Sequence, residues 1–221
     1  MQALRVLAKN FLNLIYPLHC LGCQSALEAT NEFRLCERCI ASINRNSMPP
    51  FELDASSVLA YSACLYDDEL KGLIHRFKYK GKTVLANIFS RLMIGYIKDN
   101  PEITEVDLVT VVPLHKERLK EREFNQSFLL ADPISKEYSL ALTNTLGKMR
   151  RTRHQNELTK GERLKNLKGA FSVLREADIT GKRMLLIDDV MTTGSTLGEC
   201  AKTLLNGGAK SVKCFTLARG I

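Results

Sequence analysis

Two adjacent carboxylates and a loop rich in hydroxyl groups follow a continuous apolar run. The run Met184–Ile187 leads into Asp188 and Asp189, and then into Thr192-Thr193-Gly194-Ser195-Thr196. The apolar run predicts a buried strand, and the pattern from Leu197 to Leu205 predicts a helix. A loop between a strand and a helix directs backbone N–H groups at one point, which suits a phosphate group. Carboxylates beside it suit ribose hydroxyls or a magnesium ion, so the segment predicts a sugar-phosphate site.

A simpler interpretation of this segment is a strand whose last residue caps the next helix, because Asp and Thr are common at helix N-termini. Capping requires one acidic residue rather than a pair, which favours the binding site. A Walker-type loop is excluded, since no Gly-Lys-Ser/Thr follows the hydroxyl loop.

The same segment resembles the signature of type I phosphoribosyltransferases, enzymes that use 5-phosphoribosyl-1-diphosphate (PRPP). The resemblance covers the strand, both acids and the loop. It implies that Asp188 and Asp189 contact the ribose hydroxyls. It also implies that the 5′-phosphate is bound by Thr192, Thr193, Gly194, Ser195 and Thr196.

Four of the seven cysteines form two Cys-x-x-Cys pairs, Cys20/Cys23 and Cys36/Cys39, with residues 24–35 between them. This spacing is typical of a zinc ion held tetrahedrally by four thiolates. All four ligands come from the protein, so the zinc is predicted to be structural and coupled to the folding of a small module. The alternatives are disulfides, which cytosolic redox conditions disfavour, and an iron–sulfur cluster, whose ligand spacings differ.

The size and composition of the chain indicate a globular α/β protein with an appended module. With 221 residues we expect an N-terminal helix and zinc ribbon over 1–48 and a larger domain over 55–221. The formal charge of +8 favours anionic partners. Apolar residues at helical spacing near the N-terminus are interrupted by polar ones, so we expect an amphipathic helix, no membrane span and a cytoplasmic location.

Three further segments carry positive charge. The first is Lys78-Tyr79-Lys80-Gly81-Lys82, and the second holds Arg118 and Arg122 one helical turn apart after the predicted strand Val106–Val112. The third, residues 147–169, has eight basic residues against two acidic ones, and we expect its first part to be a mobile loop that closes over a charged substrate. The alternatives are a solvated turn, a salt-bridged helix face and a solvated connection, respectively.

Strands that alternate with helices predict a doubly wound parallel sheet. Loops at the carboxyl ends of parallel strands meet at one edge of such a sheet. The loop after Val112 is therefore expected to face the hydroxyl loop across the site. There Arg118 and Arg122 would bind a diphosphate.

Several stretches taken together resemble the ComF family, also called GntX-like, over nearly the whole chain. They are the four-cysteine module, the Lys-Tyr-Lys-Gly-Lys segment, residues 112–127 and the positions Arg153, Gln155, Leu158, Arg163, Asn166 and Gly169-Ala170-Phe171. The resemblance implies a zinc ribbon joined to a type I phosphoribosyltransferase-like domain, and a role in natural transformation with the DNA-uptake machinery. Two positions depart from the family pattern: Glu123 stands where glycine is expected, and His154 replaces a more usual acidic residue.

Two functions follow, from different classes. The first is a protein that binds PRPP with magnesium and handles incoming single-stranded DNA; its DNA-binding residues would be Lys78, Tyr79, Lys80, Lys82, Arg150, Arg151 and Arg153. The second is an enzyme that transfers the phosphoribosyl group to a nucleobase or amine, with Asp188, Asp189, Arg118 and Arg122 as its catalytic residues. No residue in the sequence stands out as a general base or as a base-recognition group.

Overall fold

A five-stranded sheet forms the centre of the computed structural model, which describes residues 17–53, 58–79, 83–150, 166–175 and 177–220. The predicted N-terminal helix and the residues Lys80, Lys82, Arg151, Arg153 and His154 lie outside these ranges. The strand order is β3-β4-β9-β8-β5. Strands β4, β9, β8 and β5 are parallel, and β3 pairs antiparallel with β4 at one edge. The bounds are Phe51–Leu53 (β3), Val58–Leu65 (β4), Leu108–Val111 (β5), Arg183–Met191 (β8) and Ser211–Arg219 (β9).

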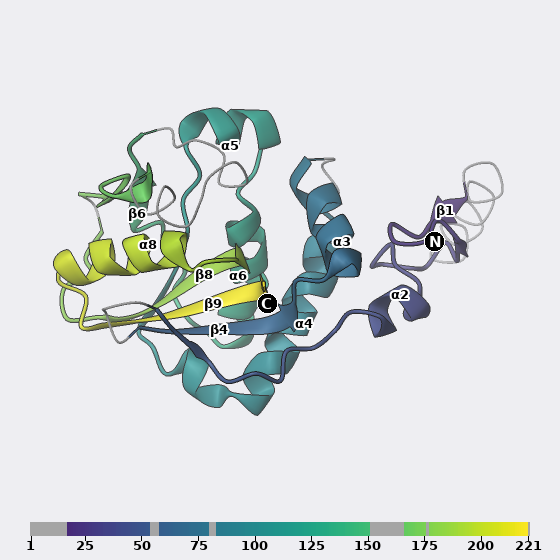
Figure 1. Cartoon of the computed structure of the whole chain (residues 1–221), viewed down its shortest axis with the longest axis horizontal. Helices are drawn as coiled ribbons and strands as arrows, with labels where there is room; N and C mark the ends of the chain where they lie inside the picture. The colour runs from purple at the N-terminus through teal and green to yellow at the C-terminus, as the bar shows by residue number, and fades with distance from the viewer. Residues whose placement is uncertain (1–16, 54–57, 80–82, 151–165, 176, 221) are drawn as a thin grey trace, which may run out of the picture.

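Helices cover both faces of this sheet, as Figure 1 shows. Helices α4 (Leu85–Asp99) and α6 (Gln126–Glu137) pack on one face, with α3 (Asp68–Tyr79) beside α4, and α8 (Ser195–Asn206) packs on the other. Successive side chains of a strand point to opposite faces, so β8 contributes to both hydrophobic cores. Leu185 and Ile187 join the α4/α6 side, whereas Met184 and Leu186 join the α8 side. The predicted doubly wound architecture is confirmed.

One strand is longer than the sequence pattern indicates. The apolar run ends at Ile187, but β8 continues through both aspartates to Met191. The reason is the neighbouring strand: Asp188 pairs with Thr216, Val190 with Ala218 and Met191 with Arg219 of β9. The two acids therefore stand on the rigid end of a central strand rather than on the loop that follows.

Shorter elements complete the edge of the sheet near the acids. Helix α5 (Lys116–Arg122) connects β5 to α6, and the 3-10 helix η1 (Pro101–Thr104) precedes β5. Strands β6 (Leu146–Lys148) and β7 (Phe171–Val173) form an antiparallel pair.

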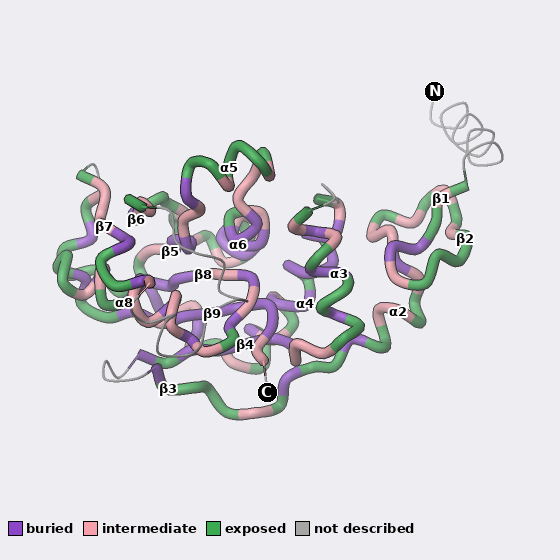
Figure 2. Tube along the Cα trace, turned by 45° about the horizontal axis from the view of Figure 1, so that its top comes forward, coloured by how far each residue is buried: buried purple, intermediate pink, exposed green. Residues whose placement is uncertain are grey.

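The four-cysteine module lies beside α3 at one end of the molecule, as Figures 1 and 2 both show. It contains the antiparallel pair β1 (Leu18–His19) and β2 (Ala26–Leu27) and the short helix α2 (Glu37–Ala41). Its buried Leu21 and Leu35 belong to the same hydrophobic cluster as residues of α3 and α4. The module is thus packed on the α/β domain. Among the described residues, no helix has the length and apolar character that crossing a bilayer requires.

Candidate ligand-binding site and metal centre

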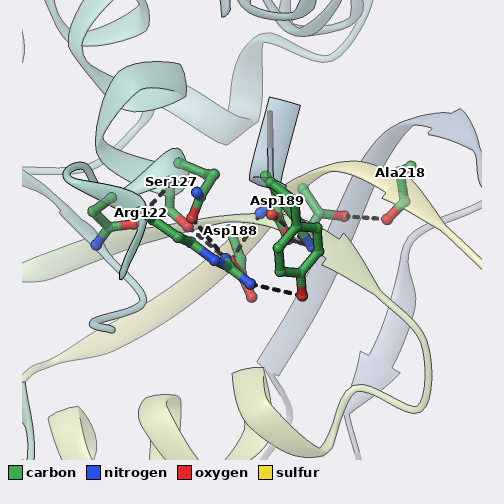
Figure 3. Close-up of polar contacts among 10 residues, drawn as sticks. Arg122, Ser127, Asp188, Asp189 and Ala218 are labelled. Atoms are coloured by element: carbon green, nitrogen blue, oxygen red, sulfur yellow. Dashed lines mark hydrogen bonds and ion pairs between the residues drawn. The ribbon is translucent and has the colours of Figure 1, made fainter. Parts of the chain in front are cut away.

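Asp188 and Asp189 line a cavity of about 290 Å³ at the carboxyl end of the parallel strands. Each carboxylate has its own partner (Figure 3). Asp188 Oδ1 accepts hydrogen bonds from Ser127 Oγ at 2.8 Å and from the Asp189 backbone N–H at 2.9 Å. The two carboxylate oxygens of Asp189 lie 2.9 and 2.8 Å from Lys78 Nζ. The acid pair is therefore held in place from α6 on one side and from α3 on the other.

The electrostatic environment differentiates the two acids. Burial, and then the negative charge of Asp189, raises the pKa of Asp188 to about 7, against smaller opposing effects of Lys78 and Ser127. Burial lowers the pKa of Lys78, but the charges of Asp189 and Asp188 outweigh this effect, so its pKa lies above the ordinary value. Lys78 thus remains an ammonium ion at neutral pH, and Asp188 is the acid with the less complete charge compensation.

Three further cationic side chains, Arg118, Arg122 and Lys148, line the same cavity in addition to Lys71 and Lys78 of α3. Arg122 donates to Gln126 Oε1 at 3.0 Å and to the hydroxyl oxygen of Tyr79 at 2.9 Å, and its guanidinium carbon is 4.7 Å from the centre of the Tyr79 ring. Burial, and then the positive charge of Arg118, lowers the pKa of Lys148. The structure therefore brings both predicted arginines and one further cation to the acid pair.

The hydroxyl loop begins where β8 ends and turns directly into α8. Gly194 has a left-handed backbone, with φ of +73°, and a Cβ atom there would lie 2.5 Å from Leu53 Cδ2. Thr193 Oγ1 and Ser195 Oγ are 2.9 Å apart. Residues 190–197 surround a small concavity, which shares Val190 and Thr196 with the acid-lined cavity. The acids and the loop thus border two neighbouring recesses that share lining residues.

The residues expected to bind nucleic acid divide into two groups within the described part of the chain. Tyr79 is 57% exposed, and the exposed Arg150 donates to the Lys168 carbonyl at 2.9 Å. Lys78, in contrast, points into the cavity and is paired with Asp189. The sequence pattern did not single out Ser127 or Lys148, because neither belongs to a spacing that identifies a ligand group.

The four cysteine sulfurs of the N-terminal module lie within 4.8 Å of one another. The Sγ atom of Cys36 is 3.7 Å from that of Cys20 and 3.6 Å from that of Cys23. A tetrahedron with Zn–S bonds of about 2.3 Å requires sulfurs about 3.8 Å apart, whereas a disulfide bond measures about 2.05 Å. The backbone N–H groups of Gly22 and Cys36 also point at Cys20 Sγ, at 3.4 and 3.3 Å. The cluster can therefore hold a metal ion such as zinc.

The pKa values of these thiols show what such an ion would change. Hydrogen bonds from Ser25, followed by one involving Arg38, lower the pKa of Cys23 to about 5. Burial, followed by the neighbouring sulfurs, raises the pKa of Cys39 to about 12. Four close thiolates repel one another, and a divalent cation removes this conflict while releasing protons. The donor set fits zinc.

Comparison with known proteins supports this description of the larger domain. A model of the phosphoribosyl transferase domain family matches residues 125–221, which include α6, the acid pair and the hydroxyl loop. Together with the mostly parallel sheet, this match defines the class: a protein with a type I phosphoribosyltransferase-like domain and an N-terminal four-cysteine module.

Curated relatives identify the family. The chain is 33% identical to the DNA utilization protein YhgH of Escherichia coli over 204 residues, which cover 89% of this chain and 82% of that protein. It is 32% identical to competence protein F of Haemophilus influenzae, over 70% of this chain and 69% of that protein. The chain belongs to the ComF family. Among solved structures, an adenine phosphoribosyltransferase from Thermoanaerobacter pseudethanolicus aligns with 83% of this chain and 98% of its own, at 13% identity and a TM-score of 0.41.

Proposed function

We propose that this protein binds PRPP together with magnesium and handles single-stranded DNA in natural transformation. One observation carries the first half: the acid pair and several cations line one cavity, and the hydroxyl loop surrounds a neighbouring concavity that shares two residues with it. PRPP presents the matching set of groups, namely a diol, a 5′-phosphate and a diphosphate. The names of the relatives, a DNA utilization protein and a competence protein, support the second half.

Each part of PRPP has a partner in this proposal. The 5′-phosphate binds the backbone N–H groups and hydroxyls of residues 192–196, at the N-terminus of α8. Asp188 and Asp189 accept hydrogen bonds from the ribose hydroxyls. Arg118 and Arg122 bind the diphosphate. Carboxylate and phosphate oxygens are the ligands that magnesium prefers, so the ion would neutralise charge between the acids and the diphosphate.

The proposed DNA contacts are on the outer side of the same region. Tyr79 is largely exposed although Arg122 and the His75 ring both contact it, and in this proposal the exposed part of its ring stacks with a base. Arg150 follows β6 and is exposed. The net charge of +8 would strengthen attraction to phosphates, which makes binding dependent on salt.

Calorimetric titration with PRPP and magnesium tests the PRPP half of the proposal. We expect binding to the wild-type protein and a loss of affinity of at least about 100-fold in Asp188→Ala/Asp189→Ala, because two charged hydrogen-bond partners are removed. Asp99→Asn, on the exposed end of α4, is the matched control and should bind as the wild type does. No heat of binding in the wild-type protein would contradict the proposal.

Fluorescence anisotropy with a labelled single-stranded oligonucleotide tests the DNA half. Affinity is expected to fall steeply between low and moderate salt. Tyr79→Ala should weaken binding by about tenfold through the lost stack, whereas Tyr79→Phe should retain most of it. Arg150→Ala removes another proposed DNA contact. Its control is Met149→Ala, because Met149 is the neighbouring residue and is also exposed. Affinity that does not change with salt would rule out a phosphate-based interface.

Phosphoribosyl transfer is the second candidate function. It is favoured by the cations in the same cavity as the acid pair, since they would stabilise a leaving diphosphate. The test is release of diphosphate from PRPP in the presence of nucleobases and amines, with Arg118→Ala as the variant that should slow it by about tenfold or more. If no diphosphate is released with any of these acceptors, the transferase function is contradicted and the binding function is unaffected.

A further inference from the structure

The ammonium group of Lys78 lies where a bound cation would also be placed. Its Nζ atom is within 2.9 Å of both carboxylate oxygens of Asp189, at the wall of the cavity. The side chain of Lys78 is 21% exposed and that of Asp189 is 10% exposed, so water screens this pair less than it screens a surface pair. One of the two acids, Asp189, is thus already paired with a positive charge of the protein.

We infer that Lys78 is a built-in counter-cation that prevents a divalent metal ion from binding the acid pair before PRPP arrives. This inference rests on the proposed PRPP site and adds an order of binding to it. Because Lys78 offsets part of the negative charge of the acid pair, the pair alone attracts magnesium weakly. The diphosphate of PRPP adds the missing negative charge, so magnesium enters together with PRPP.

The geometry makes Lys78 a positioning residue with a distinct role from its neighbours. Lys71, on the same helix, lines the same cavity, but its side chain is 62% exposed and lies 4.0 Å from Asp68. Ser127 holds Asp188 by a neutral hydrogen bond and therefore leaves its charge uncompensated. Of these three residues, only Lys78 brings a positive charge into contact with the acid pair.

The inference is tested by measuring Mn²⁺ binding to the zinc-loaded protein by electron paramagnetic resonance, in the absence of PRPP. The wild type should bind Mn²⁺ weakly, and Lys78→Met should bind it at least about tenfold more tightly, because a repelling charge is removed from a poorly screened site. Lys78→Arg keeps the charge and should bind as weakly as the wild type. Lys71→Met should change the affinity less than about threefold, since an exposed charge is well screened.

Two outcomes overturn the inference. One is an unchanged Mn²⁺ affinity in Lys78→Met. The other is found in the wild type and does not depend on the folding of a variant: Mn²⁺ that binds as tightly without PRPP as with it. A wild-type protein that binds no PRPP in calorimetry contradicts the proposed function instead, and the two failures are therefore distinguishable.

Discussion

At the scale of single residues, the acid pair combines two carboxylates with opposite electrostatic situations. Lys78 forms an ion pair with Asp189, whereas Asp188 accepts hydrogen bonds from Ser127 and the backbone and receives only a longer-range effect of the Lys78 charge. An acid in this position is costly to ionise, and the pKa of Asp188 is raised to about 7. A cavity that holds an incompletely compensated carboxylate is well suited to donors such as ribose hydroxyls.

The raised pKa of Asp188 leads to a prediction on pH and stability. Folded protein keeps the Asp188 proton up to about pH 7, whereas the unfolded chain loses it near the ordinary pKa of 3.8. The folded state therefore binds more protons in this window, and the free energy of unfolding falls as the pH rises through it. Asp188→Asn should remove this dependence and raise the free energy of unfolding near neutral-to-basic pH by about 2–4 kcal/mol.

Urea denaturation of ligand-free protein at about pH 5 and about pH 8 measures this effect. The exposed Asp99→Asn is again the control and should keep the wild-type dependence on pH. If the free energy of unfolding changes between these two pH values equally in the wild type and in Asp188→Asn, Asp188 ionises normally and the prediction is wrong.

The sequence was sufficient to predict that the acids, the hydroxyl loop and the two arginines lie at the same end of the sheet, because they adjoin in sequence or follow neighbouring strands. It was not sufficient for their partners. Ser127 is 61 residues from Asp188, and Lys78 is 111 residues from Asp189, so no local spacing connects them. Lys78 and Tyr79 were grouped as one basic surface, but consecutive helical residues point in different directions. As a result, Lys78 is paired with Asp189, whereas Tyr79, which also lines the cavity, is largely exposed.

At the scale of elements, the end of β8 and the start of α8 fix the shape of the recess. The apolar pattern predicted the strand but ended it at Ile187, since polar residues read as a loop. Pairing with β9 extends the strand through both acids, and this pairing depends on long-range contacts that periodicity does not contain. The turn that follows is possible because Gly194 adopts a left-handed conformation.

Two glycines of this region give a matched pair of substitutions. Gly194→Ala should lower the free energy of unfolding by about 2 kcal/mol or more, because φ is +73° and the new Cβ would lie 2.5 Å from Leu53 Cδ2. Gly198→Ala, four residues later within α8, meets no atom within 4 Å and should stabilise the helix by about 0.5–1 kcal/mol. Denaturant unfolding measures both, and equal effects of the two substitutions would contradict the role given to Gly194.

Helix α5 ends at one of the two residues that depart from the family pattern. Glu123 caps the helix with φ of +67°, a conformation that glycine adopts without steric cost. Glu123→Gly relieves this steric cost, but glycine also gives the unfolded chain more conformational entropy, which offsets part of the gain. The net effect should be a rise of about 0.5 kcal/mol in the free energy of unfolding. Glu121→Gly, inside the helix, should lower it by about 0.5–1 kcal/mol. Loss of stability in both variants would contradict this assignment.

At the scale of the whole molecule, helix α3 joins the two centres. Arg76 donates to the Gly22 carbonyl at 3.3 Å, within the first cysteine pair, and Lys78 pairs with Asp189 two residues later. Arg91 of α4 lies over the Phe33 ring at 4.6 Å. The sequence predicted the cysteine cluster from its spacing, but this packing of the module on α3 and α4 comes from contacts that spacing does not encode.

Loss of a structural metal should therefore unfold the module first and then loosen α3. Cys23 is exposed, so Cys23→Ala removes little buried surface and tests the thiolate itself. We expect it to abolish zinc retention, as measured by elemental analysis, and to abolish amide protection across residues 17–48 in hydrogen-exchange mass spectrometry. Protection in α3 should decrease, whereas β8 and β9, at the centre of the sheet, should keep theirs.

The proposed control is Ser25→Ala, which removes the hydroxyl next to Cys23 but keeps all four thiols. It should retain zinc and protection of the module. A Cys23→Ala variant with full zinc content, or with unchanged protection in residues 17–48, would show that the four sulfurs do not form a structural metal centre. If protection is lost equally in β8 and β9, the module and the α/β domain unfold as one unit, because the shared cluster of Leu21, Leu35 and the α3 residues then couples them completely.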